Sequence, residues 1–159
     1  SVYRRKHLGY IFQMYNLIPN LTAVENVELP LIYRGVSRSV RQELSREALK
    51  KVGLEYRMDH KPSEMSGGQQ QRVAIARAIA QAPPVILADE PTGNLDSNST
   101  KEIMDILKGL HNEGRTVILI THDNDIAAQA KRVIKIKDGK VESDSGQIVP
   151  VEELQTAGA

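Results

Sequence analysis

The residues whose types and spacing are best suited to chemistry lie in residues 65–96, MSGGQQQRVAIARAIAQAPPVILADEPTGNLD. Ser66, Gly67, Gly68 and Gln69 open a helical pattern in which the glycines let a ligand approach the backbone. The first turn of a helix offers unpaired N–H groups and the positive end of its dipole, which suits phosphate. The same S-x-x-Q spacing also forms a capping box that only begins a helix, and these four residues taken alone favour that simpler interpretation.

Two carboxylates, Asp89 and Glu90, follow a short apolar run at residues 85–88. A continuous apolar run of this length after two prolines is typical of a parallel strand covered on both faces. Ligands of open α/β sheets bind at the carboxyl ends of the strands, so we expect both side chains to face a ligand. They could instead cap the next segment, but the following PTGNLD favours a site.

A second apolar run, residues 116–120, precedes His122. Between the two runs, the spacing of Ser99 and Glu102 predicts a capping box and a helix that lies on the sheet. A histidine before a helix is commonly an ordinary polar residue. Because the carboxyl ends of two strands converge, we expect His122 to join the carboxylates in one site.

Composition excludes several classes of function. The 159 residues carry 21 basic and 20 acidic side chains, so a net charge of +1 gives no electrostatic reason to expect nucleic acid. The absence of cysteine excludes disulfides and thiol chemistry within these residues. No apolar run approaches the roughly 18 residues that cross a bilayer. These features predict a soluble, intracellular chain whose role at a membrane would depend on a partner.

Five motifs in a fixed order resemble the nucleotide-binding subunit of ATP-binding cassette (ABC) transporters. Residues 65–69 are similar to the signature motif, residues 85–90 to the Walker B strand and residues 94–96 to the D-loop. Gln13, in GYIFQMYNLIP, resembles the Q-loop glutamine, and His122 resembles the switch histidine. The resemblance implies an α/β fold of the P-loop NTPase (RecA-like) class, an ABC ATPase core with a helical subdomain.

The resemblance also implies roles and cofactors, ATP and Mg²⁺. Asp89 would hold Mg²⁺, Glu90 would act as general base on the attacking water, and His122 would contact the γ-phosphate. Gln13 would reach both Mg²⁺ and the water. The signature and D-loop residues would act on ATP held by the opposite subunit of a dimer or communicate across it, namely Ser66, Gly67, Gly68, Gln69 and Asp96.

The phosphate-binding pattern G-x-x-x-x-G-K-[ST] does not occur in the sequence. In the family it lies upstream of the Q-loop, so we expect the sequence to be a fragment that is truncated at the N-terminus and inactive alone. The alternative is a naturally truncated subunit that binds partners without hydrolysing ATP. We expect residues 14–82 to form the Q-loop and helical subdomain. Residues 83–144 would form the Walker B, D-loop and switch part of the core, and residues 145–159 a tail.

The resemblance implies two partners, a second nucleotide-binding subunit and a transmembrane permease, at the cytoplasmic face of the membrane. Part of residues 16–33 would form the groove for the permease, or else these apolar residues are local core. The sequence is most similar to the macrolide-exporter and lipoprotein-release branch, with the cell-division branch as rival. ABC ATPases of DNA repair are a further alternative, disfavoured because no heptads or cysteines interrupt residues 13–66.

The remaining patterns predict the supporting elements. Arg72 and Arg77 interrupt an apolar helix, and we expect each to pair with a carboxylate near the D-loop. The other elements that we expect are a strand at residues 8–12, a helix at 22–29 begun by a Thr22–Glu25 capping box, a helix at 37–52, a helix at 123–131, a hairpin of strands 132–137 and 140–143, and a short helix at 151–155.

Overall fold

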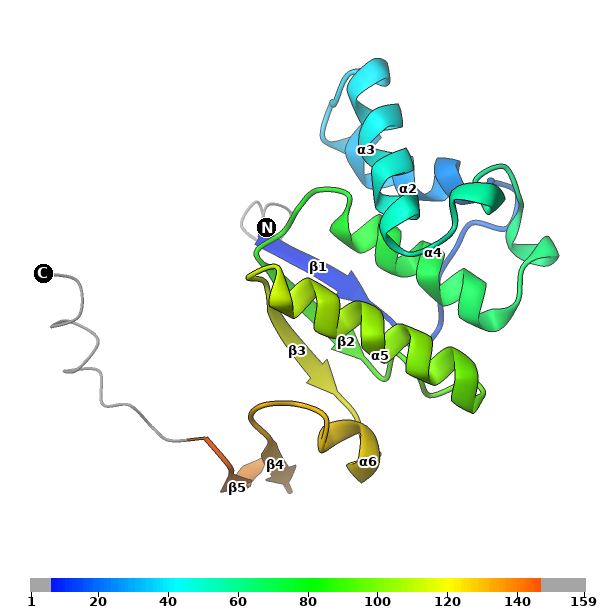
Figure 1. The fold of residues 1–159 in the computed structure, drawn as a ribbon. Helices are drawn as coiled ribbons and strands as arrows, with labels where there is room; N and C mark the ends of the chain where they lie inside the picture. Colours follow the sequence, from blue (N-terminus) through cyan, green and yellow to red (C-terminus); the bar gives the residue numbers. More distant parts are fainter. Residues whose placement is uncertain (1–6, 147–159) are drawn as a thin grey trace, which may run out of the picture. The chain divides into compact units, whose positions relative to one another are not determined.

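The computed structural model describes residues 7–146, which divide into two compact units at residues 120 and 121. The first unit is built on a parallel sheet in the order β1-β2-β3 (Figure 1). Its strands are β1 (Leu8–Ile11), β2 (Val85–Asp89) and β3 (Thr116–Ile120). Mixed parallel strands and helices confirm the predicted α/β class.

One face of this sheet forms the core of the first unit. Ile11, Ile86 and Ala88 are fully buried on it, beneath α4 (Gly67–Ile79) and α5 (Ser97–Asn112). Both helices bring apolar side chains to the sheet, and the ones buried here include Val73, Ile75, Ile103 and Leu107.

The opposite face of the sheet is open in the described residues. Leu87 on β2 pairs in register with Tyr10 on β1 and Ile118 on β3, and Tyr10 and Ile118 are 39% and 47% exposed. The expectation that β2 is covered on both faces is therefore wrong for residues 7–146. A continuous apolar run does not by itself distinguish a strand covered on one face from one covered on two.

Two further helices, α2 (Ala23–Tyr33) and α3 (Arg38–Lys51), pack on each other and on α4 (Figure 1). The predicted capping box begins α2, because Thr22 Oγ1 accepts from the Glu25 amide and Glu25 accepts from the Thr22 amide. Short 3-10 turns, η1 (Glu55–Arg57) and η2 (Pro62–Glu64), connect α3 to the start of α4.

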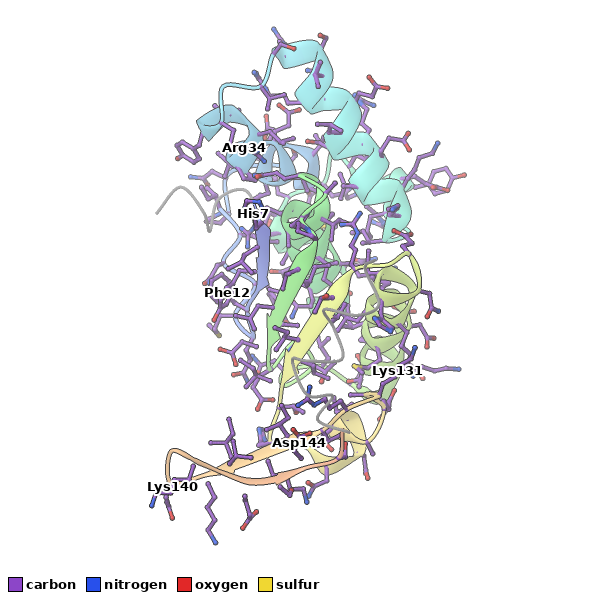
Figure 2. The ribbon with its side chains drawn as sticks, turned by 90° about the vertical axis from the view of Figure 1, so that its left-hand side faces the viewer. His7, Phe12, Arg34, Lys131, Lys140 and Asp144 are labelled. Carbon is purple, nitrogen blue, oxygen red and sulfur yellow. The ribbon has the colours of Figure 1, made fainter. Side chains whose placement is uncertain are left out.

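The second unit contains α6 (Asn124–Ala127) and the antiparallel hairpin of β4 (Ile134–Lys137) and β5 (Lys140–Asp144). Asp138 and Gly139 have φ of 50° and 73°, which is the geometry of a tight hairpin turn and confirms the Asp-Gly prediction. Figure 2 shows Lys140 at the turn and Asp144 at the other end of β5.

The helix predicted for residues 123–131 is shorter than expected. It ends at Ala127 because the amides of Gln129 and Ala130 bond to the carbonyls three residues earlier, a tightening that ends a helix. The helix predicted at residues 151–155 lies outside the described residues. Among residues 7–146, no helix combines the length and apolar character needed to cross a membrane.

Candidate functional site

The start of α4 forms the capping box that its sequence predicts. Ser66 Oγ accepts from the Gln69 amide at 3.2 Å, and Gln69 Oε1 accepts from the Ser66 amide at 3.0 Å. Helix geometry leaves the amides of Gly67 and Gly68 without an intrahelical acceptor. The capping role is confirmed, and binding of an anion by the same turn stays a prediction.

Both glycines of this turn are closely packed, and the neighbour of Gly68 has less freedom to move than the Tyr15 hydroxyl beside Gly67. A Cβ added at Gly67 would lie 2.8 Å from the hydroxyl oxygen of Tyr15. One added at Gly68 would lie 2.6 Å from Oγ and 2.9 Å from Cβ of Ser99. The start of α4 therefore contacts the loop that follows Gln13 and the first turn of α5, so three predicted motifs meet at this point.

Asp89 and Glu90 lie half-buried at the carboxyl end of β2, as predicted. Asp89 pairs in register with Ile120, and the Glu90 amide donates to the Ile120 carbonyl at 2.8 Å. Glu90 has φ of 45°, a left-handed conformation that costs a non-glycine residue about 1–3 kcal/mol and that clusters at functional sites. A hydrogen bond of 3.1 Å from the Gly93 amide to the Glu90 carbonyl closes the turn.

Gln13 follows the carboxyl end of β1 and lies against the D-loop. Its Nε2 is 3.5 Å from Asn94 Oδ1, a weak hydrogen bond. A Cβ added at Gly93 would lie 2.5 Å from the same Nε2, so this glycine leaves room for the Gln13 amide. The structure thus brings the side chain of Gln13 to the turn that carries Glu90.

Asp96 is the N-cap of α5 and is exposed. Its Oδ1 accepts from the Ser99 amide and its Oδ2 from the Ser99 hydroxyl, each at 2.9 Å. These hydrogen bonds lower the pKa of Asp96. The expected capping box of Ser99 and Glu102 is wrong, because the N-cap is Asp96, three residues earlier, and the helix begins at Ser97. A role for Asp96 across a dimer stays a prediction.

The two arginines of α4 differ in their partners. Arg72 lies 3.6 Å from Glu102 of α5, which confirms its ion pair. Arg77 donates instead to the carbonyls of Asn16 at 2.7 Å and Tyr15 at 2.9 Å, so the prediction of a carboxylate partner is wrong. Burial lowers the pKa of Arg77. These two bonds fix the backbone that follows Gln13.

Sequence reasoning missed Gln71. Its side chain is fully buried, and Nε2 donates to the carbonyls of Phe12 at 3.0 Å and Pro91 at 2.7 Å. The only signal available was a polar residue at the head of an apolar helix. That signal does not reveal which loops the amide reaches.

His122 is exposed and belongs to the second unit, two residues after β3. The neighbouring Asp123 caps α6 through hydrogen bonds from the amides of Asp125 and Ile126. Contact of His122 with a phosphate near Glu90 stays a prediction.

A cavity of about 870 Å³ opens beside the loop after Gln13, between α2, α4 and the first residues of β1. Its lining includes Ile18, Tyr33, Arg34 and Arg77, and both charged residues are basic. Residues 16–33 contain both buried and exposed apolar side chains: Ala23, Val27 and Leu31 are core, whereas Ile18, Ile32 and Tyr33 are exposed. A groove for the permease at these residues stays a prediction.

Oxygen donors at the strand ends suit a hard cation. Within residues 7–146, no group of three or more His, Asp or Glu side chains is arranged to hold a metal ion. Mg²⁺ commonly needs only one or two carboxylates, with the substrate phosphates and water completing its shell. The carboxylate of Asp89 and the amide oxygen of Gln13 are the matching donors among the predicted residues.

Comparisons with known proteins agree with this geometry. The chain is 56% identical to the macrolide export ATP-binding/permease protein MacB 2 of Aeromonas hydrophila over 144 residues, 91% of this chain and 22% of the relative. It is 56% identical to MacB of Hyphomonas neptunium over 143 residues, 90% of this chain and 22% of the relative. The chain spans about a quarter or less of the length of these curated relatives.

Solved structures show the same fold. A dimeric post-hydrolysis structure of the ATP-binding cassette MJ0796 bound to ADP and Pi is 49% identical, with a TM-score of 0.78 over 90% of this chain and 64% of that one. The dimeric structure of MJ0796, described as a bacterial ABC transporter cassette, is 50% identical, with a TM-score of 0.77 over 89% of this chain and 63% of that one. Residues 1–93 match the ABC transporter family. The chain belongs to the ABC transporter family and carries part of its ATPase cassette.

Proposed function

We propose that this chain supplies the signature, Walker B and D-loop part of an ATP-hydrolysing subunit that drives a membrane permease. The observation that carries the proposal is the convergence of Gln13, the Glu90 turn and Asn94 at the carboxyl ends of β1 and β2. Ligands of α/β sheets bind at such ends. The family membership of the chain points to ATP as that ligand.

Glu90 is the proposed general base. The left-handed backbone of Glu90 is held by the hydrogen bonds of its amide and carbonyl, which fix where its side chain leaves the sheet. A positioned base removes a proton from the attacking water as the phosphoryl group transfers. Asp89 and Gln13 would hold Mg²⁺, which when bound neutralises charge on the phosphates. His122 is proposed to contact the γ-phosphate.

The start of α4 is proposed to serve a second nucleotide, held by the opposite subunit. Ser66 is exposed, and the first turn of α4 presents the amides of Gly67 and Gly68. The dimeric state of the MJ0796 cassette supports this arrangement. Gly68 packs against Ser99, which bonds to Asp96, and this chain of contacts supports the proposal that Asp96 communicates with the same nucleotide.

The permease is proposed to dock in the cavity beside residues 16–33. Its exposed apolar lining and two basic residues suit a short apolar segment with an acidic or helix C-terminal end. The packing of α2, α3 and α4 on one another supports assigning residues 14–82 to a helical subdomain, and residues 83–144 are proposed to form the core. Docking would place the subunit at the cytoplasmic face of the membrane, and the MacB relatives support a macrolide-exporter type of partner.

The test is Mg²⁺-dependent ATP hydrolysis by the full-length protein. Glu90→Gln keeps the shape of the side chain but removes the base, so we expect kcat to fall by about a hundredfold or more. Glu55→Gln, at an exposed position in η1, is the matched control and should keep wild-type turnover. Turnover by Glu90→Gln within about twofold of wild type, or no turnover by wild type, would overturn the proposal.

A further inference from the structure

Gln71 is a buried amide that joins the two strand ends of the proposed site. Its single side-chain nitrogen donates to the Phe12 carbonyl at 3.0 Å and to the Pro91 carbonyl at 2.7 Å. Phe12 directly precedes Gln13, and Pro91 directly follows Glu90. Both protons of the amide are therefore used to hold backbone that is one peptide bond from a proposed functional residue.

We propose that Gln71 is a positioning residue that sets the separation between Gln13 and Glu90. This inference rests on the proposed ATPase function and adds a residue to it. Phe12 lies beyond the end of β1 and Pro91 beyond the end of β2, so neither residue is part of the strand pairing of the sheet. The Gln71 amide joins the two carbonyls through one side chain of α4, in addition to the bonds that hold Glu90 and the loop after Gln13.

The arrangement differs from that of a buried amide that only stabilises the fold. Asn26 is also fully buried, and both ends of its amide are used: Nδ2 donates to three carbonyls and Oδ1 accepts from the Ile18 amide. In contrast, Gln71 Oε1 is buried and accepts no hydrogen bond from any residue that the structure describes. An unpaired buried acceptor costs stability, so the Gln71 side chain contributes through the two carbonyls that it holds and not through full pairing of its own polar atoms.

Gln71 lies on the same helix, α4, as the turn that is proposed to meet the second nucleotide. The same helix begins at the Ser66–Gln69 capping box, which is proposed to meet the nucleotide of the opposite subunit. If α4 shifts when its first turn binds that nucleotide, the Gln71 amide moves with the helix. The backbone at Phe12 and Pro91, which this amide holds, then moves as well. Gln71 thereby links the partner's nucleotide to the geometry of Gln13 and Glu90.

The matched pair of variants is Gln71→Met and Arg72→Met in the full-length protein. Both replace a polar side chain of α4 by one that cannot donate, but Arg72 bonds to the Val52 carbonyl and Glu102, away from the strand ends. Misplacement of reacting groups by about 1 Å can cost a hundredfold in rate. We expect kcat of Gln71→Met to fall by about tenfold to a hundredfold with KM for ATP within about twofold, and Arg72→Met to keep kcat.

Hydrogen exchange provides a second measurement that needs no turnover. The amides of Gly93 and Leu95 bond to the carbonyls of Glu90 and Thr92 in the turn that Gln71 holds. In Gln71→Met these amides should exchange at least about tenfold faster, while the amides of α5 keep their protection. Arg72→Met should leave Gly93 and Leu95 unchanged.

The outcomes separate the two proposals. If wild type hydrolyses ATP, Glu90→Gln does not, and Gln71→Met keeps its kcat or its Gly93 protection, then the role of Gln71 is wrong and the ATPase proposal stands. If Gln71→Met does not fold, Gln71→Asn carries the test, because the shorter amide cannot reach both carbonyls. If Gln71→Met and Gln71→Asn both lose protection from hydrogen exchange throughout the chain, then Gln71 only stabilises the fold. That result would overturn the inference.

Discussion

Replacing Gly68 by alanine tests the contact between the signature turn and the D-loop helix. The added Cβ would lie 2.9 Å from Ser99 Cβ, whereas ordinary contact begins at 3.4 Å. Rotation of the Ser99 side chain relieves the clash with Oγ but not with Cβ, so α5 must retreat by about 0.5 Å. Overpacking of this kind costs about 1–3 kcal/mol, and the helix propensity of alanine recovers about 0.5–1 kcal/mol. We expect the free energy of opening of α4 and α5 to fall by about 1–2 kcal/mol.

Native-state hydrogen exchange in the full-length protein reports this loss as a lower free energy of opening for α4 and α5. Gly109→Ala is the matched control, because no atom lies within 4 Å of its added Cβ and it should stabilise α5 by about 0.5–1 kcal/mol. Ser99→Gly removes the clashing atoms, so combining it with Gly68→Ala should recover most of the loss in a double-mutant cycle. Additive effects, or a Gly68→Ala variant as stable as wild type, would refute the packing argument.

Two further predictions concern α2 and the hairpin. Thr22→Ala removes a capping box and should lower the free energy of opening of α2 by about 0.5–2 kcal/mol. Ser37→Ala is the control and should change α3 little, because the Ser37 side chain caps no described amide. Hydrogen exchange of the α2 and α3 amides tests both variants. In the second unit, hydrogen bonds from Arg132 lower the pKa of Asp144 to about 2. Because this pKa lies below the unfolded value, the stabilisation is complete above the unfolded pKa and is lost as pH falls through about 2. NMR shifts of the β4–β5 hairpin should follow this titration, and Asp144→Asn should abolish it; an unchanged titration in that variant would contradict the assignment.

The sequence predicted most of the elements because their signals are local. Capping residues and apolar periodicity identified the starts of α2 and α4, and the Asp-Gly pair identified the β4–β5 turn. The start of α5 was missed because Asp96 and Ser99 are both good N-cap residues at compatible spacings, and only packing selects between them. The length of α6 was missed because nothing in residues 128–131 is a strong helix breaker.

The candidate site was predictable in its motifs but not in its contacts. The strand pattern placed Asp89 and Glu90 at a carboxyl end, yet the left-handed conformation of Glu90 depends on its hydrogen bond to Ile120, which is remote in sequence. Gln71 and Arg77 act through backbone carbonyls of the loop around Gln13, and main-chain partners have no sequence signature. Long-range contacts to backbone therefore account for most of what was missed.

The central claim is that Glu90 and the Ser66 turn serve different nucleotides in a dimer. Ser66→Asp keeps a good N-cap and adds a negative charge where phosphate would bind, so it disables the turn without removing the helix start. Neither Glu90→Gln nor Ser66→Asp should hydrolyse ATP as a homodimer of the full-length protein. A mixed dimer of the two variants retains one site with an intact Glu90 from one subunit and an intact Ser66 from the other. The direct measurement is therefore the ATPase rate of the co-assembled variants: recovery of activity is predicted, and a mixed dimer as inactive as either parent would contradict the account.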